Sequence, residues 1–200
     1  MNGQYQNVAK TAVLSIMLTL FAGMAYGDDI TASINEALKC YKNGEYTEAV
    51  SSLNYAVQLI QQKKGGSLES FLPAPIKGWT AKETTSQTGG GGIFGAVSAE
   101  RQYQKLESSV TVRIVTDSPM LQGMMMMFAN TAFAVSDGGR LEKIAHQKAI
   151  VKYKPSEKQG DIQIIVANRF LVSVEGNGVT KANLKEYAEA VDYKKLATLP

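Results

Sequence analysis

The chain has little of what enzymes most often use for catalysis. Its 200 residues include one histidine, His146, and one cysteine, Cys40. A zinc motif of the H-E-x-x-H type needs two histidines, and a thiol–imidazole pair is not expected because the two residues lie in different segments. Ser-x-x-Lys and Gly-x-Ser-x-Gly, which mark serine nucleophiles, are also absent. We therefore predict that the protein is not an enzyme. Carboxylate pairs can still act as acid and base, but the carboxylates of Asp161 and Glu175 are expected to be ordinary exposed charges.

A single cysteine also excludes a disulfide within the chain. The helical pattern around Cys40 predicts a small buried apolar residue there. The 21 basic and 18 acidic residues are mixed along the sequence, with no basic block. Nucleic acid is therefore not an expected partner.

The first 27 residues have the pattern of a cleavable secretory signal peptide. Lys10 precedes an uncharged apolar stretch at residues 11–25, which is shorter than the ~20 residues of a membrane-spanning helix. Ala25 and Gly27 supply the small residues that signal peptidase recognises. We expect cleavage before Asp28, a periplasmic or secreted protein, and no stable membrane insertion after cleavage.

Residues 28–66 are predicted to form two antiparallel helices. Apolar residues recur at helical spacing on both sides of Asn43 and Gly44, which break the pattern. The first stripe is Ile34, Ala37, Leu38 and Tyr41; the second is Tyr46, Ala49, Val50, Leu53, Ala56, Val57 and Ile60.

This hairpin resembles one tetratricopeptide repeat over about residues 31–63. Gly44 matches the turn glycine, Tyr46 the aromatic residue after it, and Ala49 and Ala56 two small packing positions. The sequence holds no second copy and lacks the closing proline. Because one repeat does not bury its own apolar face, the hairpin is expected to pack on the rest of this chain or on another chain.

Residues 67–200 are predicted to form an antiparallel-sheet α+β domain. Period-2 alternation indicates strands around residues 110–114, 149–153, 162–166 and 170–174. Trp79 is expected at the entry to this second core. Thr180 is a candidate N-cap for a closing helix, whose apolar stripe is Leu184, Tyr187, Ala188 and Val191.

The order of these elements resembles the PsbP-like fold, an antiparallel sheet with helices on its faces. The matching parts are the helix start at residues 117–121, the segment 146–153, the hairpin 160–176 and the closing helix. The resemblance implies a non-catalytic accessory subunit of an envelope or thylakoid lumen.

Residues 120–133 hold five of the eight methionines and no charge. We expect mainly a helix buried on several sides that covers both hairpin and sheet, since methionine fills irregular gaps in cores. A partner-binding surface is the second interpretation, because flexible methionine-rich faces adapt to varied partners. The third is a Cu(I) site on one helical face, formed by Met120, Met124 and Met127.

The pattern Gly90-x-Gly92-x-x-Gly95 formally matches a dinucleotide fingerprint, with Asp117 downstream. The preceding residues are polar and no parallel βαβ unit follows, so we expect a loop between strands, and we expect no cofactor.

Together these patterns favour a non-catalytic exported protein that contacts another envelope protein. The alternative is a periplasmic carrier of a small ligand or of Cu(I). The partner-binding candidates are two tyrosines of the hairpin and three residues of the methionine-rich helix: Tyr41, Tyr46, Met125, Met126 and Phe128.

Overall fold

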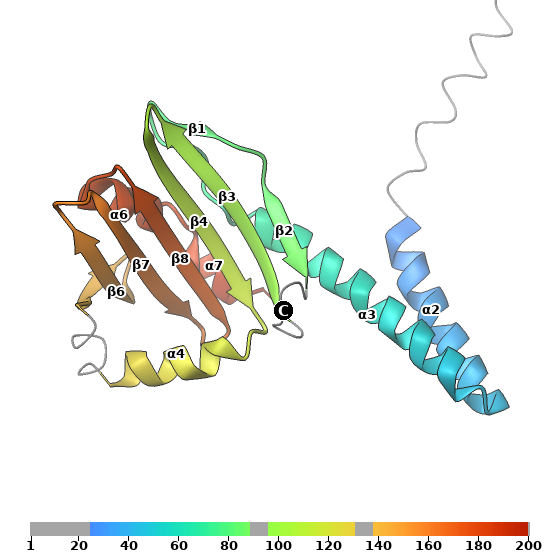
Figure 1. Ribbon diagram of the computed structural model, residues 1–200. Coiled ribbons are helices and arrows are strands. Elements are labelled where there is room, and N and C mark those ends of the chain that lie inside the picture. Colours follow the sequence, from blue (N-terminus) through green and yellow to red (C-terminus); the bar gives the residue numbers. More distant parts are fainter. Residues whose placement is uncertain (1–24, 89–95, 131–137, 200) are drawn as a thin grey trace, which may run out of the picture. The chain divides into compact units, whose positions relative to one another are not determined.

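A computed structural model describes residues 25–88, 96–130 and 138–199 of the chain (Figure 1). The predicted α+β class is confirmed, with a helical hairpin first and an antiparallel sheet with further helices after it. The chain divides into two compact units, and the first ends at Ile60. This division falls inside a helix that continues through Gly65 and Gly66 to Glu69, so the boundary expected after residue 66 lies within the same helix.

The described helices are α2 (Ala25–Asn43), α3 (Tyr46–Glu69), α4 (Met120–Ala129), α6 (Lys181–Glu189) and α7 (Tyr193–Ala197). The described strands are β1 (Thr80–Ala81), β2 (Thr85–Thr88), β3 (Val97–Lys105), β4 (Ser108–Thr116), β5 (Arg140–Ile144), β6 (Gln147–Lys154), β7 (Gln159–Val166) and β8 (Phe170–Asn177). The predicted signal peptide and the glycine fingerprint lie outside the described residues, apart from the start of α2.

The turn between α2 and α3 depends on Gly44, whose φ is +81°. Its N–H donates to the carbonyl of Tyr41 at 3.1 Å, and the N–H of Glu45 donates to the carbonyl of Cys40 at 2.9 Å. These two bonds satisfy carbonyls that the end of α2 would leave open, in the Schellman arrangement. Glycine adopts this left-handed conformation without a Cβ clash, which is why the chain reverses here.

The strands form one eight-stranded antiparallel sheet in the order β1-β3-β4-β8-β7-β6-β5, with β2 also paired to β3. The predicted hairpin across residues 167–169 joins β7 and β8, as expected. The strand β3 has neighbours on both sides, β4 on one and β1 and β2 on the other.

One face of the sheet carries the core. Most alternate residues of β3, β4, β6, β7 and β8 are apolar and buried there, as period-2 alternation predicts. The helices α6 and α7 lie over this face (Figure 1). The end of α3 and the residues after it add Leu68, Phe71, Leu72 and Trp79 to the same core, so Trp79 is buried as expected.

The start of α6 confirms the N-cap predicted at Thr180. The N–H of Asn183 donates to the Thr180 hydroxyl at 3.2 Å, and the N–H of Thr180 donates to the Asn183 side chain at 3.2 Å. This reciprocal pair is a capping box, in which two otherwise open backbone donors are satisfied. The helix buries Leu184, Tyr187 and Ala188 against the sheet.

The methionine-rich helix α4 lies at one end of the sheet, away from the face that α6 and α7 cover (Figure 1). Leu121 is its only buried residue. Met126 is 72% exposed and Met120 is 60% exposed. The expected burial on several sides is therefore wrong, because α6, α7 and the end of α3 already cover the apolar face of the sheet.

This placement of α4 predicts different effects on stability for two substitutions in the helix. Met126→Asp should leave the melting temperature nearly unchanged, because its side chain is already in water. Leu121→Asp should lower the free energy of unfolding by about 3 kcal/mol, because it buries an unpaired carboxylate. Thermal unfolding of both variants checks this, and equal destabilisation would mean that α4 is buried after all.

Glu142 of β5 holds α6 to the sheet. Its carboxylate pairs with the ammonium groups of Lys181 and Lys185, the latter at 2.6 Å. Lys181 is the first residue of α6, where a positive charge is unfavourable to the helix dipole, and the carboxylate offsets this. Hydrogen bonds from these two lysines lower the pKa of Glu142.

Glu142→Gln should therefore destabilise the protein by about 1 kcal/mol near neutral pH. Because the folded-state pKa lies below that of the unfolded chain, the contribution is full above the unfolded value, about 4.3, and is lost as pH falls through the folded value. Urea unfolding of wild type and variant across this range should show the two curves converging in acid. Glu157→Gln, which alters the exposed pair with Lys154, is the control and should change little.

Candidate functional site

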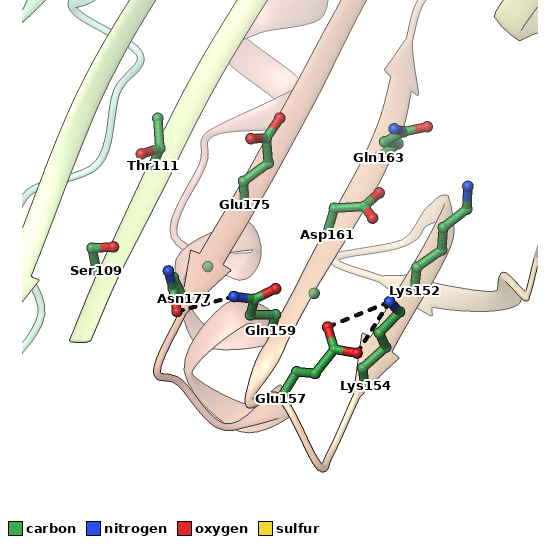
Figure 2. A pocket seen from close by; sticks show the side chains of 12 residues that line it. Ser109, Thr111, Lys152, Lys154, Glu157, Gln159, Asp161, Gln163, Glu175 and Asn177 are labelled. Carbon is green, nitrogen blue, oxygen red and sulfur yellow. Dashed lines mark hydrogen bonds and ion pairs between the residues drawn. The ribbon is translucent and has the colours of Figure 1, made fainter. Parts of the chain in front are cut away.

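Two surfaces of the molecule are candidates for function, and the first is the face of the sheet opposite the core. A hollow of about 610 Å³ lies over β4, β6, β7 and β8, and the side chains around it stand on the strands with their polar ends outward (Figure 2). The antiparallel register sets Thr111, Glu175, Asp161 and Lys152 in one row, each directly opposite the next. The row carries charges of both signs.

Asp161 and Glu175 thus face each other on neighbouring strands, a pairing that was not predicted. Their pairing was derivable, since residues equidistant from a three-residue turn at 167–169 must meet in an antiparallel hairpin. Like charges directly opposite are unfavourable, and Lys152 on the other side of Asp161 offsets this. In the described part of the chain, no group of three or more His, Cys, Asp or Glu residues is arranged to hold a metal ion.

Cys40 and His146 are placed in different units. Cys40 is buried in the hairpin, as expected. Desolvation, together with nearby Glu45 and Glu36, raises the pKa of its thiol and so disfavours the reactive thiolate. His146 is exposed in the turn between β5 and β6.

The second candidate surface is one face of the hairpin α2–α3. The buried residues of the hairpin are mostly small: Ala37 and Cys40 on α2 and Ala49 and Ala56 on α3, together with the larger Leu59. Large apolar residues point outward instead and are about half exposed. They are Ile34, Leu38, Tyr41, Tyr46, Val50, Leu53, Val57 and Ile60, called the apolar hairpin face below.

These eight residues lie on the same side of the hairpin. At 100° per residue, the exposed residues of each helix form one stripe, turned from its buried stripe by about a quarter turn. Because the helices run antiparallel, the two rotations have opposite directions when both helices are viewed from the same end of the hairpin. Both exposed stripes therefore lie on one face. The rings of Tyr41 and Tyr46 meet at the turn with centroids 5.9 Å apart, which joins the two stripes.

The opposite face of the hairpin is polar. A hollow of about 460 Å³ there is lined by Ala32, Ser33, Glu36, Ser51, Ser52 and Tyr55. Tyr55 is 53% exposed and lies two residues from Leu53, which is 48% exposed on the apolar hairpin face. The hairpin therefore has one apolar and one polar face.

The structure brings two of the five predicted partner-binding residues together, Tyr41 and Tyr46. The other three lie on α4 in the second unit, where Met126 is exposed and Met125 and Phe128 are half-buried. Helical spacing put four exposed residues of α3 in one stripe with the buried alanines, and their exposure was not predicted: Val50, Leu53, Val57 and Ile60. Of the predicted copper ligands, Met120 is exposed, and Met124 and Met127 are half-buried.

Comparisons of the chain with protein-family models, with curated proteins and with solved structures found no match. Among the described residues, no helix is long and apolar enough to cross a membrane. The function is therefore inferred from the surfaces of the molecule.

Proposed function

We propose that this protein is a non-catalytic binding protein of the cell envelope and that it binds its partner through the apolar hairpin face. The main support for this proposal is the exposure of eight large apolar side chains on one side of the two helices. Monomeric proteins rarely expose a contiguous apolar patch of more than a few hundred Å², and larger patches mark interaction sites.

The energetics support this use of the face. Fully burying a Val, Leu or Ile side chain is worth roughly 1.5–3 kcal/mol, so each half-exposed residue leaves part of that stabilisation unrealised. Placing mostly small residues inside and eight large ones outside is the reverse of what the stability of an isolated hairpin favours. The resemblance of residues 31–63 to a tetratricopeptide repeat supports the same function, because such a repeat buries its face against a neighbour.

Capture from envelope extracts tests the proposal with a matched pair of variants. Leu53→Lys places a charge in the middle of the apolar hairpin face, while Tyr55→Lys places the same charge on the polar face of the same helix at similar exposure. We expect wild type and Tyr55→Lys to retain their captured partner and Leu53→Lys to lose it. Equal capture by all three would show that the face does not bind.

Location in the envelope rests on the pattern of residues 1–27 and has its own test. The N-terminus of the protein recovered from the envelope should be Asp28 or a close neighbour. A membrane-bound product that retains Met1 would refute export with cleavage.

A further inference from the structure

We infer that the occupant of the apolar hairpin face is a second copy of the same hairpin, paired about a two-fold axis into a four-helix bundle. This inference rests on the proposed function and names the partner of the same surface. Four properties of the face support it: its area, the spacing of its residues, its lack of charge and its restriction to one side of the hairpin.

The area is sufficient for a stable dimer. The eight side chains are between 45% and 64% exposed, and together they present on the order of 800 Å². One partner of a standard-size protein interface contributes a similar area. Two copies of the face therefore match each other in extent, without a contribution from any other part of the chain.

The spacing of the apolar residues fits another helix. Tyr46, Val50, Leu53, Val57 and Ile60 follow one another at intervals of four, three, four and three residues. This is the spacing of a coiled-coil seam, whose side chains insert between those of a facing helix. Ile34, Leu38 and Tyr41 repeat the four-three interval on α2, so both helices of one hairpin can pack against both helices of another.

The face contains no charged residue, which suits pairing with itself. Helical spacing places Glu36, Lys39 and Glu48 on the sides turned away from the apolar stripes. In a two-fold interface each residue meets the same surface patch on its partner, so any charge near the axis would meet a like charge. A neutral face avoids that repulsion.

The polar opposite face limits the assembly to two copies. A stack of repeats needs an apolar surface on both sides of each unit, so that every unit contacts two neighbours. Here the side lined by Ser33, Glu36, Ser51 and Ser52 is polar. Pairing through the single apolar face buries it in both copies, and the described part of the hairpin offers no second apolar face to extend the assembly.

Analytical ultracentrifugation of the protein recovered from exporting cells, with the N-terminus it has there, tests the inference. Interfaces of this area have dissociation constants from micromolar to picomolar, so wild type should have the mass of a dimer at about 10 µM. Leu53→Lys should halve the mass, with a dissociation constant raised by at least about 30-fold. Tyr55→Lys should remain a dimer.

Far-UV circular dichroism shows whether each variant is folded, and Val57→Lys replaces Leu53→Lys should the latter unfold. A monomeric wild type at about 100 µM, or a folded Leu53→Lys that stays dimeric, would overturn the inference. If wild type is monomeric while Leu53→Lys alone loses an envelope partner, the second copy is wrong as the occupant and the proposed function stands. If the substitution changes neither mass nor capture, both are wrong.

Discussion

Replacing Tyr187 with alanine should lower the free energy of unfolding by about 3–5 kcal/mol. Tyr187 is fully buried on α6, where its ring lies 4.4 Å from that of Tyr103 and 5.5 Å from that of Trp79, measured between centroids. Tyr103 belongs to β3, and Trp79 belongs to the segment that follows α3. Truncation therefore leaves a cavity where three parts of the chain meet. Urea unfolding monitored by tryptophan fluorescence measures the loss.

Tyr187→Phe is the matched control, since it keeps the ring and removes only the hydroxyl. Within the described part of the chain that hydroxyl lies near the backbone of Ile76 but has no hydrogen bond of ordinary geometry. Burial raises the pKa of Tyr187 to about 12, so the hydroxyl is neutral at physiological pH. We expect Tyr187→Phe to change stability by less than about 1 kcal/mol. If alanine is tolerated as well as phenylalanine, the aromatic cluster does not hold α6 on the sheet.

Another buried tyrosine provides the contrast. The hydroxyl of Tyr193 donates to the carbonyl of Ala188 at 2.6 Å. Tyr193→Phe leaves that buried carbonyl without this donor and should lower the free energy of unfolding by about 1–2 kcal/mol. Comparing the two phenylalanine variants separates the contribution of the rings from that of the hydroxyl groups.

The features that could be predicted from the sequence are those set by local chemistry. Period-2 alternation located β4, β6, β7 and β8, because one face of an antiparallel sheet is buried and the other is solvated. Thr180 was predictable as an N-cap because its hydroxyl can accept from the backbone N–H three residues later. Gly44 was predictable as the turn between the helices because glycine readily adopts the left-handed conformation that ends a helix.

The features that could not be predicted depend on competition between segments. An uncharged methionine-rich helix is compatible with burial, but α6, α7 and the end of α3 occupy the apolar face of the sheet, and α4 lies at its end. In the hairpin, Ala49 and Val50 are adjacent in sequence and belong to one apolar pattern. Ala49 is buried and Val50 is exposed, so the two residues lie on different sides of α3. Helical periodicity shows that the pattern is apolar without showing which part of it faces the partner helix.

Gly160→Ala should lower the free energy of unfolding by about 3 kcal/mol, because a Cβ has no space there. Gly160 of β7 lies directly opposite Gly176 of β8. A Cβ on Gly160 would collide with the backbone oxygen of Lys152 on β6 and would lie 2.9 Å from Cδ2 of Tyr153. The backbone oxygen belongs to the neighbouring strand of the ladder, so relief requires a shift of β6 itself. Thermal and urea unfolding measure the effect.

Two other glycines make this prediction specific to close contact. A Cβ on Gly176 would lie 2.5 Å from Cγ2 of Val179 and 2.6 Å from Cδ2 of Leu184. Both are ends of side chains that can move, so Gly176→Ala should lower stability by about 1–2 kcal/mol, less than Gly160→Ala. A Cβ on Gly66 in α3 would meet nothing within 4 Å, and Gly66→Ala should raise stability by about 0.5–1 kcal/mol because alanine favours the helix. If all three variants shift stability in the same direction and by the same amount, chain entropy and not the contact at the paired glycines determines the effect.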